Sequence, residues 1–212
     1  MNDPAGDVLD NEIYNLTNLE DENRGVPTRA IYNLGSSDLP RFSCANHKLS
    51  CAINTALVKQ GVCLNICKTL SSANAELRNS IKANHVFRNL KCRTRIYQKT
   101  RWCGAILLLF SNKRAYDNGA YDGEISCPKA LVQIETYIQI LMPAYYATLG
   151  WEKNRSSIAD VIPQVLFLID FWTKFVTDDK EAQELCFFLI HFVKVKFKYE
   201  IESEIYQVII KN

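Results

Sequence analysis

A threonine, an arginine and a tryptophan, Thr100-Arg101-Trp102, stand directly before an apolar run. Threonine is a common N-cap residue, so this order predicts that Arg101 and Trp102 lie at the N-terminus of a helix. That end of a helix carries free backbone N–H groups and a partial positive charge. The Arg101 guanidinium is suited to clamping a phosphate, and the Trp102 indole to stacking on a base. In the alternative interpretation, Trp102 is a core residue that Arg101 covers.

A second group that could do chemistry is Cys44-Ala45-Asn46-His47, with Cys51 one helical turn further on. Two more cysteines, Cys63 and Cys67, are spaced for one face of the next helix. Cysteine and histidine on one helical face can bind zinc, but structural zinc sites normally have tighter ligand spacing. Buried thiols beside one hydrogen-bonded histidine are the alternative. We therefore assign no metal ligand.

Charge is distributed very unevenly along the chain. Residues 41–114 contain fourteen Lys and Arg but one acid, Glu76, whereas residues 1–24 contain seven acids and one base, and residues 115–212 fourteen acids and nine bases. A basic block of this kind predicts a polyanionic partner; a solvated helical surface is the alternative. The candidate phosphate contacts cluster before and at the Thr-Arg-Trp motif: Arg88, Lys91, Arg93, Arg95, Lys99 and Arg101.

The elements that must position these residues are helices. Residues 1–40 are rich in Asp, Asn, Gly and Pro and predict an acidic flexible leader. Residues 41–212 show helical periodicity, with a basic DNA-facing part (41–116) and an acidic helical part (125–212). The expected helices span about 43–60, 62–69, 75–92, 100–115, a segment from Pro128, 158–176 and 178–198. Strict alternation over residues 193–202 is a competing strand signal.

Several classes of protein find no support in the chain. It has no Gly-rich phosphate loop, no nucleophile elbow and no metal-type histidine pair. A two-metal nuclease needs clustered acids, and the basic block offers Glu76 alone. There is no secretion signal and no apolar run of membrane-spanning length. We expect a soluble intracellular protein with reduced thiols and no membrane partner.

Four segments resemble hAT transposases, which are ribonuclease-H-like transposases, in their order and spacing over residues 39–212. Residues 39–49 resemble an apolar lead-in followed by Cys-x-x-His and Leu, and Thr100-Arg101-Trp102 is similar to the family's Thr-Arg-Trp motif. Residues 135–143 are similar to a helix that ends in Leu-x-Pro, and residues 162–166 to the Leu-Pro-Thr-Leu segment. The family usually continues Thr-Arg-Trp with Asn-Ser, where this chain has Cys103-Gly104.

The resemblance implies a truncated or domesticated transposase: the end of the first part of the catalytic core and most of the all-helical insertion. Two of the three catalytic acids would precede Cys44, and the third would lie beyond Asn212. The resemblance places Cys44 and His47 near DNA, and Trp102 beside a flipped base. Full-length members would need Mg²⁺ or Mn²⁺, whereas for this chain we expect no cofactor. It also implies a nuclear protein.

Together these observations predict a mainly α-helical bundle with little or no sheet and a basic DNA-binding surface, a non-catalytic remnant of a hAT-like transposase. The expected partners are DNA and, as possible protein partners, further copies of the chain or related transposase chains. Two alternatives remain open. One is a helical protein-interaction module that does not bind nucleic acid. The other is a nucleic-acid-binding module stabilised by zinc at Cys44, His47, Cys51 and Cys63.

Overall fold

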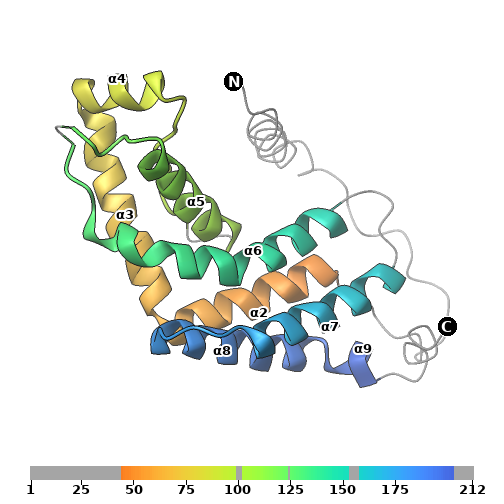
Figure 1. The fold of residues 1–212 in the computed structure, drawn as a ribbon. Helices are drawn as coiled ribbons and strands as arrows, with labels where there is room; N and C mark the ends of the chain where they lie inside the picture. Colours follow the sequence, from red (N-terminus) through yellow and green to blue (C-terminus); the bar gives the residue numbers. More distant parts are fainter. Residues whose placement is uncertain (1–43, 99–101, 124, 153–157, 203–212) are drawn as a thin grey trace. The chain divides into compact units, whose positions relative to one another are not determined.

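The structure, a computed structural model, describes residues 44–98, 102–123, 125–152 and 158–202 (Figure 1). The chain divides into two units, Met1–Phe42 and Ser43–Asn212, and all described residues belong to the second. They form eight α-helices and one 3₁₀ helix and contain no strand, so the mainly helical prediction is confirmed. The elements are α2 (Ala45–Gln60), α3 (Val62–Asn79), α4 (Ile81–Asn89), α5 (Cys103–Asp117), η1 (Lys129–Gln133), α6 (Ile134–Trp151), α7 (Ile158–Lys174), α8 (Lys180–Lys196) and α9 (Lys198–Glu202). The predicted leader, residues 1–40, lies outside the described residues.

Four long helices, α2, α6, α7 and α8, form the body of the unit. Helix α2 packs along α8, and α7 and α8 form an antiparallel hairpin that also contacts α6 (Figure 1). Leu49, Ile53 and Leu57 recur at helical spacing on α2 and are buried. On α7 the Trp172 indole Nε1 donates a hydrogen bond to the Ile140 carbonyl of α6, at 2.9 Å. Apolar burial therefore holds the body together, and the buried indole donor of Trp172 is satisfied by backbone.

Gly61 separates α2 from α3, as the sequence predicts. Its φ of 77° lies in the left-handed region, which a glycine adopts without a Cβ clash. Its N–H donates to the Leu57 carbonyl and so completes the last turn of α2. A sharp change of direction is thereby made with one residue, and α3 leads from the body toward α4 (Figure 1).

The prediction of two helices over 62–69 and 75–92 is wrong in where it puts the break. Helix α3 is continuous to Asn79, and the chain breaks at Ser80, whose hydroxyl caps α4 by accepting from Ala83 N–H. Ser71 and Asn74 look like helix-weakening residues in sequence. In the structure their side chains hydrogen-bond to the segment that follows α4, so tertiary contacts keep the helix intact.

The C-terminal hairpin settles the conflict between helix and strand signals. Asp179 caps α8 by accepting hydrogen bonds from the N–H groups of Glu181 and Ala182. Helix α8 continues to Lys196, and Lys198–Glu202 is helical as well, so the helical interpretation of this segment is the right one. Val193 and Phe197 are buried four residues apart, as a helix requires.

None of the described helices is long and apolar enough to cross a bilayer.

Candidate nucleic-acid interface

The candidate interface is a segment that we call the basic arm, residues 71–98. It comprises the C-terminal half of α3, all of α4 and the extended segment 91–98. It contains six Lys and Arg residues against a single acid, Glu76. Its cations are Arg78, Lys82, Arg88, Lys91, Arg93 and Arg95.

Hydrogen bonds from α3 fix the path of the extended segment. Asn74 Nδ2 donates to the Arg95 carbonyl at 2.7 Å, and Arg78 Nε donates to the Thr94 carbonyl at 3.2 Å. Ser71 Oγ accepts from the Tyr97 N–H at 3.0 Å. The segment therefore runs antiparallel to α3. These three hydrogen bonds tie the backbone of the segment to the helix without a second strand.

Helix α4 ends in a Schellman motif with a lysine where glycine is usual. Lys91 N–H donates to the Arg88 carbonyl at 3.0 Å, and Cys92 N–H to the Phe87 carbonyl at 2.8 Å. Lys91 has a φ of 51°, the one positive φ of a non-glycine residue among the described residues. A side chain in this region costs roughly 1–2 kcal/mol relative to glycine. The motif holds the Lys91 side chain exposed at the turn between α4 and segment 91–98.

The predicted phosphate contacts differ in how accessible they are. Arg88, Lys91 and Arg93 are exposed and are close in sequence around the end of α4. Arg95 is half-buried, and its charge partly offsets the burial that raises the pKa of the Tyr145 phenol of α6, which is about 12. Lys99 and Arg101 lie outside the described residues. Three of the predicted cations are thus exposed and follow one another in sequence around the end of α4.

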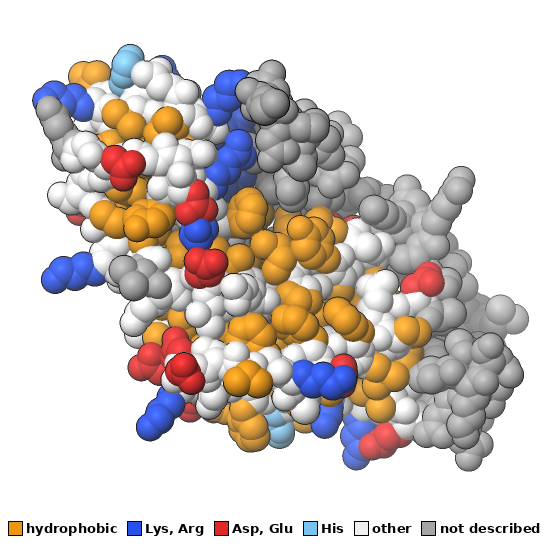
Figure 2. Space-filling view, in the orientation of Figure 1, with side chains coloured by type: hydrophobic (Ala, Val, Ile, Leu, Met, Phe, Trp, Pro, Cys, Tyr) orange, Lys and Arg blue, Asp and Glu red, His pale blue; other side chains and the backbone are white. Residues whose placement is uncertain are grey.

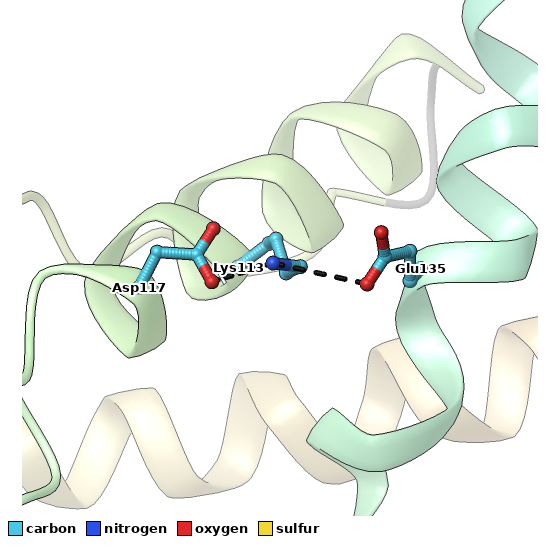
Figure 3. A network of polar contacts seen from close by, with 3 residues as sticks. All are labelled: Lys113, Asp117 and Glu135. Carbon is cyan, nitrogen blue, oxygen red and sulfur yellow. Dashed lines mark hydrogen bonds and ion pairs between the residues drawn. The ribbon is translucent and has the colours of Figure 1, made fainter.

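Lys113 of α5 belongs to the basic block by sequence, but it is neutralised locally (Figure 3). Its Nζ lies 2.5 Å from Asp117 Oδ1 and 3.8 Å from Glu135 Oε2 of α6. The hydrogen bond to Asp117 raises the pKa of Lys113. Lys113 therefore joins α5 to α6 and contributes little net positive charge to an interface.

The stacking role predicted for Trp102 is wrong for this structure. Trp102 is only 1% exposed and lies at the N-cap position of α5. Its ring meets Tyr145 of α6 edge to face, with centroids 6.4 Å apart and an interplanar angle of 79°. An indole in this position cannot accept a base on its face. Trp102 is a core residue that joins the start of α5 to α6, which is the alternative that the sequence left open.

Cys44 and His47 do not join the arm either. Both are exposed at the N-terminal end of α2, whereas α3 and the arm continue from the other end of that helix (Figure 1). Sixteen residues of helix separate the two ends by about 24 Å. The length of α2 therefore separates Cys44 and His47 from the point where α3 begins and leads to the arm.

The proposed zinc ligands are not gathered into one site. His47 Nε2 lies 3.5 Å from Cys51 Sγ, but Cys63 is fully buried on α3. A hydrogen bond with Cys67 and burial raise the pKa of the Cys63 thiol, which keeps it protonated. Within the described ranges, no three His, Cys, Asp or Glu side chains come together as metal ligands.

In the surface view, hydrophobic side chains and Lys and Arg side chains both occur over much of the visible face, with local gatherings of each (Figure 2). Hydrophobic side chains gather over α6 and α7 in the middle of the view, while Lys and Arg side chains border its upper end near α4 and α5.

Asn74 is the residue of this site that the sequence analysis missed. It continues the buried stripe of Cys63, Cys67 and Leu70 at helical spacing, a signal that was available in the sequence.

No protein-family model matches the chain, and no curated protein or solved structure is significantly similar to it. The likeness of its motifs to those of hAT transposases therefore stays a prediction.

Proposed function

We propose that the basic arm binds the phosphate backbone of a polynucleotide, DNA in the first instance, and that the chain acts by binding rather than by catalysis. The observation that carries the proposal is the exposed group Arg88, Lys91 and Arg93 around the end of α4, within an arm whose one acid is Glu76. Lysine and arginine contacts to phosphate supply affinity without reading sequence.

The conformation of Lys91 supports this proposal. Backbone strain that a glycine would relieve is tolerated at functional positions where the side chain is needed. Here the side chain is a cation between two exposed arginines. Its position at the C-terminus of α4 also complements the helix dipole, so the fold gains from the charge as well.

A salt titration of DNA binding tests the proposal. Anisotropy of a labelled duplex should report binding that weakens linearly in log–log form as salt rises, with a slope of about −0.9 for each neutralised phosphate. Arg88→Gln with Arg93→Gln should weaken binding uniformly across duplex sequences. The double variant should also reduce the slope by about two, one per removed cation.

The matched control removes two exposed charges from α8, Lys180→Gln with Lys196→Gln, which gives the same change in net charge. We expect this variant to bind like the unmodified chain. Equal loss in both double variants would mean that only net charge matters, and salt-independent binding or none would overturn the proposal.

The proposed lack of catalysis has a separate test. The arm offers Glu76 as its only carboxylate, and a two-metal nuclease site needs several. Incubation with hairpin and nicked DNA should give no cleavage, with or without Mg²⁺ or Mn²⁺. Robust metal-dependent cutting would contradict this part while leaving DNA binding intact. A remnant of a hAT-like transposase acting in the nucleus remains our interpretation of the sequence motifs.

A further inference from the structure

The outward face of α8 carries an ordered set of four exposed residues: Glu184, Phe187, His191 and Lys194. Their spacing of three, four and three residues places them on one side of the helix. Phe187 is 65% exposed, and its ring lies nearly parallel to the His191 imidazole, with an interplanar angle of 12° and centroids 6.5 Å apart.

This face is distinct from the one that holds α8 in the fold. The buried residues of α8 are Ala182, Leu185, Cys186, Leu189 and Val193, which leaves the aromatic pair pointing away from the body. Glu184 and Lys194 have no ion-pair partner among the described residues, and a separation of ten residues keeps them from pairing along the helix. The face therefore presents an acid, an aromatic ring, an imidazole and a base in that order.

This order of side chains is complementary to the same order read in the opposite direction along the helix, because the acid at one end then faces the base at the other. Glu184 and Lys194 each lie five residues from Leu189, about 7.5 Å to either side of it along the helix axis. Phe187 and His191 each lie two residues from the same point. Two such helices can pack antiparallel through these outward faces, related by a two-fold axis at the level of Leu189 along the helix. This arrangement would put Glu184 of each against Lys194 of the other. The same operation would bring Phe187 of each helix to His191 of the other.

We propose that this face of α8 is the docking surface for a second copy of the chain, in a symmetric antiparallel dimer. Charge complementarity selects this occupant, because an isologous interface forms every favourable contact twice. A parallel arrangement would instead set like charges opposite one another. The exposed Val195 lies at the rim and extends the apolar contact. One helix face is smaller than a standard interface, so the dimer is weak and depends on concentration.

Sedimentation velocity of the full chain without nucleic acid tests the proposal. The mass should rise from 24.3 kDa toward twice that value as the concentration increases from micromolar to near-millimolar. Glu184→Lys and Lys194→Glu should each weaken self-association about tenfold or more, because each change turns two attractions into two repulsions. The double variant that carries both changes should regain self-association, since it restores opposite charges in every pair.

The matched control reverses an ion pair within α7, Asp170→Lys with Lys174→Glu, where the two groups already contact each other at 2.7 Å. This swap should leave self-association unchanged, and circular dichroism should show all variants folded. A mass of 24.3 kDa at every concentration would overturn the proposal. So would single reversals without effect, or a double variant that fails to recover.

Discussion

Helices α4 and α5 end in the same backbone pattern, but with different residues in the left-handed position. At the end of α5, Gly119 has a φ of 75°, and Ala120 N–H donates to the Ala115 carbonyl at 2.9 Å. At the end of α4, Lys91 takes the place of that glycine, with a φ of 51°. Glycine adopts this conformation without strain, and lysine does not. The comparison shows that the chain tolerates backbone strain at the end of α4, where the strained residue, Lys91, carries a positive charge.

The two helix ends also lie next to each other. Asn118 Nδ2 lies 3.4 Å from Cys92 Sγ, and the rings of Phe87 and Tyr121 meet edge to face at 6.0 Å. Two helix C-termini bring two partial negative charges together, which a nearby cation stabilises. Lys91 therefore has two roles that substitutions can separate: it complements this junction, and in our proposal it contacts phosphate.

The largest loss of stability should come from the hydrophobic core rather than from either of these helix C-termini. Trp102→Ala removes a fully buried indole and its edge-to-face contact with Tyr145, and should cost about 3–5 kcal/mol of unfolding free energy. Urea denaturation followed by circular dichroism measures this loss. The folded fraction should bind DNA as the unmodified chain does. A stable variant with much weaker DNA binding would instead favour the stacking role that the structure argues against.

Alkaline pH should produce the next largest decrease in the free energy of unfolding. Burial raises the pKa of the Cys186 thiol from 9.0 to about 11, and that of the Tyr121 phenol from 10.0 to about 12. The unfolded chain loses these protons first, so stability is full below pH 9 and falls as the pH rises toward the folded values. Urea midpoints measured from pH 7 to pH 11 should decrease, and Cys186→Ala should flatten the first part of that decrease. Midpoints that rise with pH would contradict the burial of both groups.

The stability of the basic arm should depend on the Asn74 side chain. Asn74→Ala leaves the Arg95 carbonyl without its donor and should cost about 1–3 kcal/mol. Hydrogen exchange should then show faster exchange at Tyr97, whose N–H donates to Ser71 Oγ, because segment 91–98 loosens. Unchanged exchange there would mean that Asn74 does not position the segment.

At the end of α5, Gly119→Ala should cost about 1 kcal/mol or more. The added Cβ would meet Asp122 Oδ2 at 2.7 Å, so the Asp122 side chain must also shift. Thermal denaturation gives the loss, and Gly123→Ala, where a Cβ meets nothing within 4 Å, is the control. An effect no larger than that of the control would show that the left-handed position carries no strain.

The smallest effect, and the sharpest comparison, is at Lys91. Lys91→Gly and Lys91→Gln remove the same charge, but only glycine relieves the backbone strain. The glycine variant should therefore be more stable than the glutamine variant by about 1 kcal/mol. Equal unfolding free energies from urea titrations would show that the strain is absent.

Sequence reasoning was most successful where a helix signal is local. Gly61 ends α2 as predicted, and the start of α8 falls two residues after the predicted Asp178, with Asp179 as its cap. It failed where partners distant in sequence decide the outcome. Ser71 and Asn74 keep α3 intact by binding residues 97 and 95, and no property of the stretch 62–79 alone reveals those partners.

The candidate site shows the same contrast between features that local sequence predicts and features that residues distant in sequence decide. The charge block could be located from composition, because it depends on residue types alone. The burial of Trp102 could not be predicted, because an aromatic ring at a helix start suits a core as well as a ligand, and Tyr145 on another helix decides between them. The strained Lys91 was predicted as a cation, but its backbone conformation follows from the Schellman hydrogen bonds.

The most direct test of the central claim is the salt dependence of DNA binding for Lys91→Gly and Lys91→Gln, measured beside the unmodified chain. If the basic arm contacts phosphates through Lys91, both variants should bind more weakly, with the log–log slope reduced by about one, although one variant is more stable than the other. Affinity and slope equal to those of the unmodified chain in both variants would contradict the account.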